Sequence, residues 1–368
     1  MRIALDTQST VGRKTGIGIY TARLLDALRR VGPEHEYREI AWDRDVPMRL
    51  DRRLRWQQWD LPRRVRAADA DLLHVPGFDA PRRKPCPVVL TVHDLIGMLF
   101  PQNLPPVSCF YWSRWLPWGV RWASRVIADS EHTRRDIVRL MGIPAERIAV
   151  IPLGVEPAFH PIHDNALLAA LRQKYGLPAQ IILYVGTLEP RKGLDMLVDA
   201  YAALASELSH DLVIAGKRGW YTESLFRQVA QLGLERRVHF TDYVPDDDLP
   251  GLLNLADVFV FPSRYEGFGL PPLEAMACGV SVVSSDAASL PEVVGDAGLL
   301  FPCGDSTALA AALRRTLTDP DLRVRLQAQG RARARQFTWE ATAQRTLHVY
   351  EQCLLGVRET MGREGSLA

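Results

Sequence analysis

Two glutamates eight residues apart, Glu266 and Glu274, lie in the stretch of sequence with the most recognisable chemistry, residues 261–279. The stretch predicts a strand end, a loop with two glycines, and a helix with two prolines in its first turn and a glycine after its end. Such a loop presents backbone N–H groups and a positive helix end at the carboxyl edge of a parallel sheet, where ligands bind. Each carboxylate there can accept hydrogen bonds from a pair of neighbouring hydroxyls.

Two cations, Arg191 and Lys192, follow a predicted strand at residues 181–185 by a short loop that opens a helix. Cations in this position would face a diphosphate and neutralise the charge that grows as a sugar–phosphate bond breaks. They are therefore predicted to replace a divalent metal, and we expect no metal site. The acidic run at residues 246–248 is more typical of a helix start than of a metal loop. A solvated turn is the structural alternative for the two cations.

Two further candidates lie in the first half of the chain. His93 follows an apolar run at residues 88–92, so it should lie at the carboxyl end of a strand and point into a cleft between domains. A lone histidine at a strand end is more often structural than catalytic. Gly16 and Gly18 are predicted in a loop before a helix at residues 20–30, where backbone could approach a phosphate or an acceptor. A plain tight turn explains these glycines almost as well.

Short apolar runs alternate with amphipathic stretches, which is typical of βαβ units and parallel sheets. The predicted strands of the first series are residues 3–6, 72–75, 88–92, 126–130 and 149–151. Those of the second are 181–185, 212–215, 238–240, 258–261, 280–284 and 299–301. Helices are expected between them, for example over residues 131–141. The pattern predicts an α/β protein with two Rossmann-like domains.

A domain boundary is predicted within residues 152–178, where Pro152, Gly154, Pro157 and Pro161 interrupt any regular element. The expected domains are residues 1–160 and 161–338. A further helix, at about residues 339–355, follows the second sheet, and a flexible tail is expected near residues 362–368.

Composition limits the class of protein. The formal charge of +2 conceals an asymmetry, since residues 1–160 carry +7 and residues 161–368 carry −5. The five widely spaced cysteines favour neither disulfides nor a zinc site, which indicates a reducing cytoplasm. No signal peptide and no run of about 18 apolar residues is recognised, so membrane contact would be peripheral.

The residues 261–279 resemble the E-x7-E motif of glycosyltransferase family 4, and the resemblance extends over nearly the whole chain. The other similar strings are GIG at 16–18, TVHDL at 91–95, SEHT at 130–133, IPLGV at 151–155, GTLEPRKG at 186–193 and SLPEVVGD at 289–296. The resemblance implies a GT-B fold, in which two Rossmann-like domains with parallel sheets face each other across a cleft. It further implies that residues 1–160 bind the acceptor, that residues 161–338 bind a nucleotide-sugar, and that the last helix packs back on the first domain.

The resemblance also assigns roles to residues. Glu266 would bind hydroxyls of the donor sugar, Glu274 would hold the ribose hydroxyls, and His93 would contact the sugar or shape the reacting centre. The remaining donor-binding residues would be Gly16, Gly18, Gly186, Phe268, Gly269 and Leu270. Many relatives carry an arginine where this chain has Thr187, which leaves the number of phosphate-binding cations open.

The implied activity is a retaining, metal-independent transfer of a hexose from a nucleotide-sugar. Transfer would occur on one face of the sugar, and the leaving phosphate would help to deprotonate the acceptor hydroxyl. Relatives with strings such as EPRKG and YEGFGLP are often mannosyl- or rhamnosyl-transferring enzymes of surface-polysaccharide assembly, and this likeness favours mannose, with GDP-mannose as the donor. No separate cofactor is expected.

The acceptor side offers one clear feature, the aromatic and basic segment at residues 110–125, which the arginine-rich residues 49–66 could assist. Together with the positive first half, it favours an anionic acceptor such as a polyprenyl-diphosphate-linked sugar at the inner membrane surface. Core packing of the four tryptophans at helical spacing is the stronger alternative. Nucleic acid is a poor fit, because no reading motif accompanies the basic residues.

Other functions compete with this interpretation. A GT-B epimerase or phosphorylase would bind a nucleotide or phosphate in the same cleft, and a non-catalytic subunit of a glycosylation complex would retain nucleotide-sugar binding. A dehydrogenase would need a third glycine and a glycine loop directly after the first strand, and Gly16 lies about ten residues beyond it.

Overall fold

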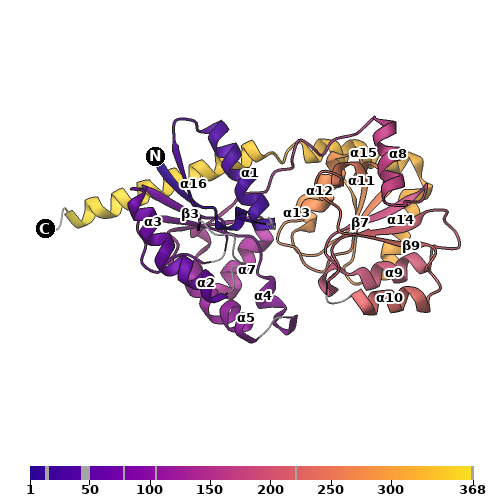
Figure 1. The fold of residues 1–368 in the computed structure, drawn as a ribbon, viewed down its shortest axis with the longest axis horizontal. Helices are drawn as coiled ribbons and strands as arrows, with labels where there is room; N and C mark the ends of the chain where they lie inside the picture. Colours follow the sequence, from indigo (N-terminus) through magenta and orange to yellow (C-terminus); the bar gives the residue numbers. More distant parts are fainter. Residues whose placement is uncertain (13–15, 43–49, 78, 104–105, 220–221, 366–368) are drawn as a thin grey trace. The chain divides into compact units, whose positions relative to one another are not determined.

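The computed structural model describes residues 1–12, 16–42, 50–77, 79–103, 106–219 and 222–365. These residues form two compact units, which Figure 1 shows in the colours of the sequence. The first unit comprises Met1–Gly154 and Thr338–Ala368, and the second is the continuous segment Val155–Phe337.

The first unit contains a parallel sheet of six strands in the order β2-β1-β3-β4-β5-β6. The strands are β1 (Arg2–Asp6), β2 (Glu36–Ile40), β3 (Leu72–Val75), β4 (Val88–Val92), β5 (Arg125–Ala128) and β6 (Ile148–Val150). β3 and β4 are buried along their whole length, as near-continuous apolar runs must be when helices cover both faces of a parallel sheet.

The helices of the first unit differ widely in length. They are α1 (Gly16–Val31), α2 (Leu50–Arg55), α3 (Leu61–Ala67), α4 (Ile96–Leu99), α5 (Pro106–Phe110), α6 (Leu116–Trp122), α7 (Glu131–Met141) and α16 (Trp339–Gly365). The segments Trp56–Asp60 and Tyr111–Trp115 are π-helical turns. α7 has the predicted bounds because the side chain of Ser130 caps its first turn and Gly142, at φ 64°, ends it.

Helix α16 completes the first unit although it follows the second unit in the sequence. It packs along α1 and reaches β4. Tyr350 of α16 is fully buried, and its hydroxyl lies 2.6 Å from Nδ1 of His74. The other ring nitrogen of His74, Nε2, lies 2.9 Å from the hydroxyl of Thr91. Residues 362–365 of the expected tail belong to this helix, and residues 366–368 lie outside the described residues.

The second unit contains a parallel sheet of six strands in the order β12-β11-β10-β7-β8-β9. The strands are β7 (Ile181–Val185), β8 (Asp211–Ala215), β9 (Val238–Asp242), β10 (Val258–Phe261), β11 (Ser281–Ser285) and β12 (Leu299–Phe301). The helices are α8 (Asn165–Lys174), α9 (Leu194–Ala202), α10 (Thr222–Gln231), α11 (Leu249–Asn254), α12 (Leu270–Ala277), α13 (Leu290–Val294), α14 (Ser306–Thr318) and α15 (Pro320–Ala334). The prediction of an α/β protein with two Rossmann-like domains is confirmed.

Strand β2 was not predicted. Its sequence, EYREI, carries three charged residues, and only Ile40 is buried. β2 pairs with β1 alone and lies at the edge of the sheet, where one side and much of each face meet water. An edge strand therefore needs no apolar run, which is the signal that identified the other strands.

The aromatic segment at residues 110–125 is mainly core. Trp112, Trp115 and Trp122 are partly buried and pack against the apolar cluster of the first sheet. Phe110 and Trp118 are the exceptions, with 63% and 58% of their surface exposed. Arg49, at the start of the arginine-rich stretch, lies outside the described residues.

Within the described ranges no helix is long and apolar enough to cross a membrane. All five cysteines are free thiols. No group of three or more His, Cys, Asp or Glu side chains arranged to hold a metal ion occurs among the residues that the structure describes.

Candidate functional site

Two loops at the carboxyl edge of the second sheet carry the predicted phosphate and sugar ligands. β7 and β10 are neighbours in this sheet, so the loops that follow them lie side by side. The first loop turns at Gly193, which has φ +67° and whose added Cβ would lie 2.2 Å from the carbonyl oxygen of Pro262. Only glycine permits this close approach, which brings Arg191 and Lys192 to the loop after β10.

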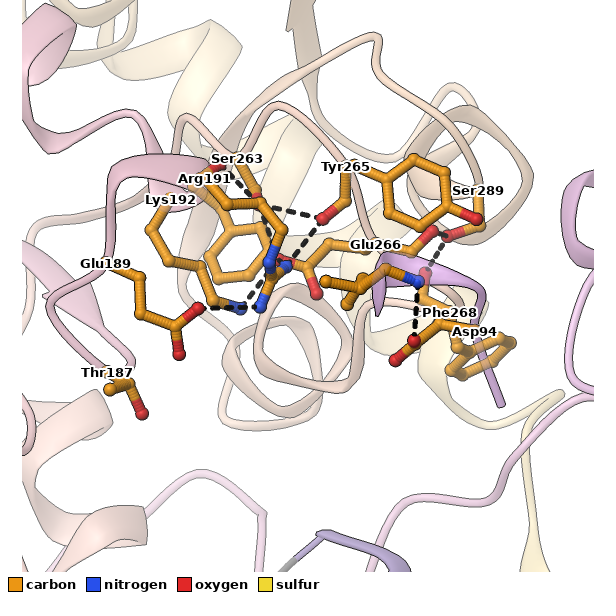
Figure 2. Close-up of polar contacts among 12 residues, drawn as sticks. Asp94, Thr187, Glu189, Arg191, Lys192, Ser263, Tyr265, Glu266, Phe268 and Ser289 are labelled. Carbon is orange, nitrogen blue, oxygen red and sulfur yellow. Dashed lines mark hydrogen bonds and ion pairs between the residues drawn. The ribbon is translucent and has the colours of Figure 1, made fainter. Parts of the chain in front are cut away.

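Arg191, Lys192 and Glu266 form an ion-pair trio. Glu266 Oε1 lies 2.6 Å from Lys192 Nζ and 3.0 Å from Arg191 Nη1. Arg191 also donates a hydrogen bond to the carbonyl oxygen of Tyr265, and Ser263 donates one to Glu266. Figure 2 shows both cations directed at the glutamate, with Glu189 on the far side of Arg191. The two predicted phosphate-binding cations and the predicted sugar-binding carboxylate thus belong to one cluster.

The trio is largely buried, since the three side chains are only 10% to 13% exposed. Burial alone would raise the pKa of Glu266, but the charges of Lys192 and Arg191 and two hydrogen bonds outweigh it and hold the pKa below its usual value. Glu266 is therefore a carboxylate, able to accept hydrogen bonds from hydroxyls. Glu189, 33% exposed, also lies 3.5 Å from Arg191, so an anionic ligand would compete with two carboxylates for the two cations.

The side chain of a serine, Ser289, fixes the loop after Glu266 by hydrogen bonds to its backbone. Ser289 Oγ donates to the carbonyl oxygens of Glu266 and Phe268, at 2.9 and 2.7 Å (Figure 2). With the carbonyls turned to Ser289, the chain enters α12 through Gly269, at φ 112°, and Leu270 begins the helix. The backbone predicted to bind the donor is thus the start of a helix, where unpaired N–H groups occur.

Gly186 lies at the end of β7, on the same loop as the two cations. Its φ is +156°, and its N–H donates to the carbonyl oxygen of Ala215 at the end of β8. Gly216, which follows β8, packs closely against Gly186. A Cβ added to Gly216 would lie 1.9 Å from the carbonyl oxygen of Gly186. The pair lets the turns after β7 and β8 pack against each other.

Glu274 lies in α12, the helix that begins four residues after Glu266. Burial, followed by the nearby carboxylates Glu156 and Asp246, raises the pKa of Glu274 to about 8. At neutral pH the group is therefore mostly a neutral acid. The two glutamates of the motif thus have opposite protonation preferences.

His93 lies in the first unit, where three neighbouring strands end. It follows β4, and its Nδ1 lies 2.7 Å from Asp129, which follows β5, while its Nε2 lies 2.8 Å from the carbonyl oxygen of Pro76, which follows β3. Both partners are acceptors, so both ring nitrogens must carry protons. Burial opposes this charge, but Asp129 and the Pro76 carbonyl outweigh it and raise the pKa of His93. The two acceptors thus favour the charged, doubly protonated form of His93.

Gly16 and Gly18 differ from their expected setting. They were expected in a loop before a helix at residues 20–30, but α1 already begins at Gly16. Gly18 is buried in the first turn, and an added Cβ on Gly16 would meet nothing within 4 Å. The loop expectation is wrong because glycine penalises a helix least in its first turn, where tertiary packing overrides local preference.

Sequence reasoning missed Ser263, Ser289 and Asp129. Ser263 lies two residues after β10, and this position was the available signal, whereas Asp129, which directly follows β5, was hidden inside the predicted strand at residues 126–130. Ser289 comes from the start of α13, so only the folded chain connects it to Glu266 and Phe268.

Comparison with solved structures defines the class of fold. The chain is similar to sucrose-phosphate synthase from Thermosynechococcus elongatus, with a TM-score of 0.76 and 24% identity over 97% of this chain and 100% of that one. It is also similar to Anabaena HepE in complex with UDP and glucose, with a TM-score of 0.74 and 22% identity over 96% of this chain and 100% of that one. The fold is GT-B.

Comparison with protein sequences gives the family. Residues 15–159 match the family described as Glycosyltransferase Family 4, and residues 169–333 match Glycosyl transferases group 1. The chain is 39% identical to O-antigen chain mannosyltransferase B of Escherichia coli over 283 residues, which cover 76% of this chain and 74% of that protein. It therefore belongs to glycosyltransferase family 4 and is a glycosyltransferase.

A second relative is much longer than this chain. The serotype-specific mannosyltransferase WbdA of Escherichia coli is 32% identical over 301 residues, which cover 80% of this chain but only 36% of that protein. This chain thus corresponds to about a third of WbdA.

Proposed function

We propose that this glycosyltransferase transfers mannose from GDP-mannose to a lipid-linked or saccharide acceptor during assembly of a surface polysaccharide. The observation that carries the proposal is the trio of Arg191, Lys192 and Glu266, in a chain 39% identical to an O-antigen chain mannosyltransferase. A cytoplasmic location belongs to the same proposal and is supported by the five free cysteines.

The proposed transfer retains the configuration of the sugar and needs no metal. An acceptor hydroxyl forms a bond to the anomeric carbon while the bond from that carbon to the diphosphate breaks. Arg191 and Lys192 stabilise the negative charge that builds up on the leaving diphosphate, and the phosphate takes the proton of the hydroxyl. Glu266, freed from part of its pairing when the cations turn to the phosphates, accepts hydrogen bonds from the sugar.

A lipid-linked acceptor is supported by exposed aromatic and basic side chains of the first unit. Phe110 and Trp118 expose more than half of their surface, and Arg114, on the intervening π-helical turn, is exposed as well. Such a surface can contact the anionic inner face of a membrane, where polyprenyl-linked saccharides are held.

The donor proposal is tested by calorimetry with GDP, UDP, dTDP and ADP in the presence of EDTA. GDP should bind most tightly, and Glu274→Ala and Lys192→Ala should each abolish or strongly weaken binding. GDP-mannose should then give an α-linked mannoside with a suitable acceptor. If another nucleotide binds more tightly than GDP, the proposed donor is wrong. The proposed mechanism is wrong if nucleotide binding requires magnesium, or if the product is β-linked.

The pKa of Glu274 predicts that nucleotide binding depends on pH. Ribose hydroxyls donate to the carboxylate, so binding favours the ionised form, whereas the free protein is mostly protonated below its pKa of about 8. Affinity should therefore rise by up to about tenfold per pH unit as the pH approaches 8, and then level off. Calorimetry at several pH values, in buffers of different ionisation enthalpy, should detect uptake of the released proton by the buffer.

Glu274→Gln supplies the matched control for this pH dependence. Glutamine has the same shape as glutamate and does not titrate. The rise of nucleotide affinity with pH should therefore disappear in the variant, except for the part that comes from titration of the nucleotide phosphate. Equal slopes in the wild type and the variant would exclude ribose binding by an ionised Glu274.

A further inference from the structure

A third basic residue, Arg264, lies on the loop after β10, two residues before Glu266, and has no part in the trio. Its backbone N–H donates to the carbonyl oxygen of Arg191 at 2.8 Å. Its side chain donates from Nη1 to the carbonyl oxygen of Pro190, and from Nη2 to Asp195 Oδ2 at 2.7 Å. All three bonds join Arg264 to the chain between β7 and the first turn of α9, which carries the two cations of the trio.

The loops after β7 and β10 exchange arginine side chains. Arg191, from the first loop, donates to the carbonyl oxygen of Tyr265 at 2.6 Å, and Arg264, from the second, donates to that of Pro190. Each guanidinium thus binds the backbone directly next to the other arginine. Because a guanidinium is planar and its donors have fixed directions, several bonds to one group also fix its orientation. The exchange therefore holds the two loops at a defined separation.

Asp195 orients the side chain of Arg264. It lies in the first turn of α9, and the two side chains are 34% and 35% exposed. An ion pair exposed to this extent adds little to the stability of a fold, because water screens its charges. Its effect is local, since it directs the guanidinium along the loop after β7 toward Pro190.

The cation loop, residues 190–193, is joined to the loop after β10 at both of its ends. Gly193 follows the two cations and packs against the carbonyl oxygen of Pro262. Pro190 precedes the cations and accepts the bond from Arg264. Charged side chains on a backbone that is already held in place lose less conformational freedom when they bind a ligand. The bond from Arg264 thus reduces the cost of ordering the cation loop around an anion.

We propose that Arg264 is a positioning residue for the donor diphosphate, which holds the cation loop against the loop after β10 so that Arg191 and Lys192 are ordered before the diphosphate binds. The inference rests on the proposed function, since that function assigns the two cations to the diphosphate. Arg264 acts through these two residues and is assigned no contact with the donor.

The test is calorimetry on the full chain with GDP and GMP. GMP lacks the terminal phosphate, so the ratio of the two affinities measures what this phosphate contributes to binding. In Arg264→Leu the preference for GDP over GMP should fall about tenfold, because binding must then order the cation loop. Arg264→Lys keeps the charge but not the planar fork, and should recover about threefold of this loss. If UDP binds the wild type more tightly than GDP, UDP and UMP are the matched pair.

Arg314→Leu is the control for the loss of an exposed arginine. Arg314 forms a two-bond pair with Glu207, at 2.8 and 3.0 Å, elsewhere in the second unit, and it is 44% exposed. The preference for GDP should stay within about twofold of the wild type in this variant. Asp195→Ala, which frees Arg264 without removing it, should lower the preference in the same direction as Arg264→Leu, and decides the matter if that variant fails to fold.

The inference is wrong if Arg264→Leu and Asp195→Ala keep the wild-type preference for GDP. It is also wrong if they lose affinity for GDP and GMP equally, because a general structural role would weaken both nucleotides alike. A wild type that binds GDP no better than GMP would instead contradict the proposed function, in which Arg191 and Lys192 bind the diphosphate, and the inference would fall with it. The wild-type titration thus separates the two failures.

Discussion

Lys192→Met is expected to lower kcat for sugar transfer about 100- to 1000-fold, the usual loss when one group that stabilises a developing negative charge is removed. Lys192 is 11% exposed, and its Nζ lies 2.6 Å from Glu266 Oε1, closer than Arg191 at 3.0 Å from the same oxygen. Arg191 remains to pair with Glu266, and the fold should survive. Initial rates at saturating donor and a thermal melt measure the two effects.

Lys192→Arg is the control for this loss. It keeps the charge but replaces a compact ammonium by a wider guanidinium, and should recover about tenfold of the activity. A Lys192→Met enzyme that retains more than about a third of wild-type kcat would contradict the assigned role, because such a residue would contribute less than 1 kcal/mol to the transition state.

Removal of α16 by a stop after Phe337 is expected to prevent the first unit from folding. The helix buries four large side chains in that unit, Trp339, Leu347, Val349 and Tyr350. At about 1.5 to 3 kcal/mol each, their loss amounts to about 6 to 12 kcal/mol, comparable with the whole stability of a typical domain. The truncated protein should lose one of two calorimetric transitions and become sensitive to protease within residues 1–154.

A stop after Leu355 is the control for this truncation. It keeps all four of the buried side chains, so the first unit should fold and melt within a few degrees of the full chain. Equal melting of both truncated proteins would show that α16 contributes little to the first unit, in conflict with its burial.

Sequence reasoning found the strands that are short apolar runs, including the edge strand β12, which is only partly buried. β3, β4, β7, β10 and β12 have the predicted bounds, because an apolar run flanked by polar residues marks such a strand clearly. β2 lacks this mark, since three of its five residues are charged and only Ile40 is buried. Local sequence thus identifies a strand only where the strand is an apolar run.

The candidate site shows a similar division. Arg191, Lys192 and Glu266 could be predicted individually, because each follows a strand of the same sheet. That the three pair with one another depends on β7 and β10 being neighbours, and this order comes from the fold alone. The same holds for His93 and Asp129, whose pairing raises the pKa of His93.

The hydrogen bond between Tyr350 and His74 spans 276 residues of sequence and has a consequence for synthesis of the chain. Domains usually fold in order as they leave the ribosome, the first one first. Here the second unit, Val155–Phe337, is complete in the nascent chain before the first unit can acquire its last helix. The first sheet must wait, with the surface that α16 will cover still exposed, until residues 339–350 have been translated.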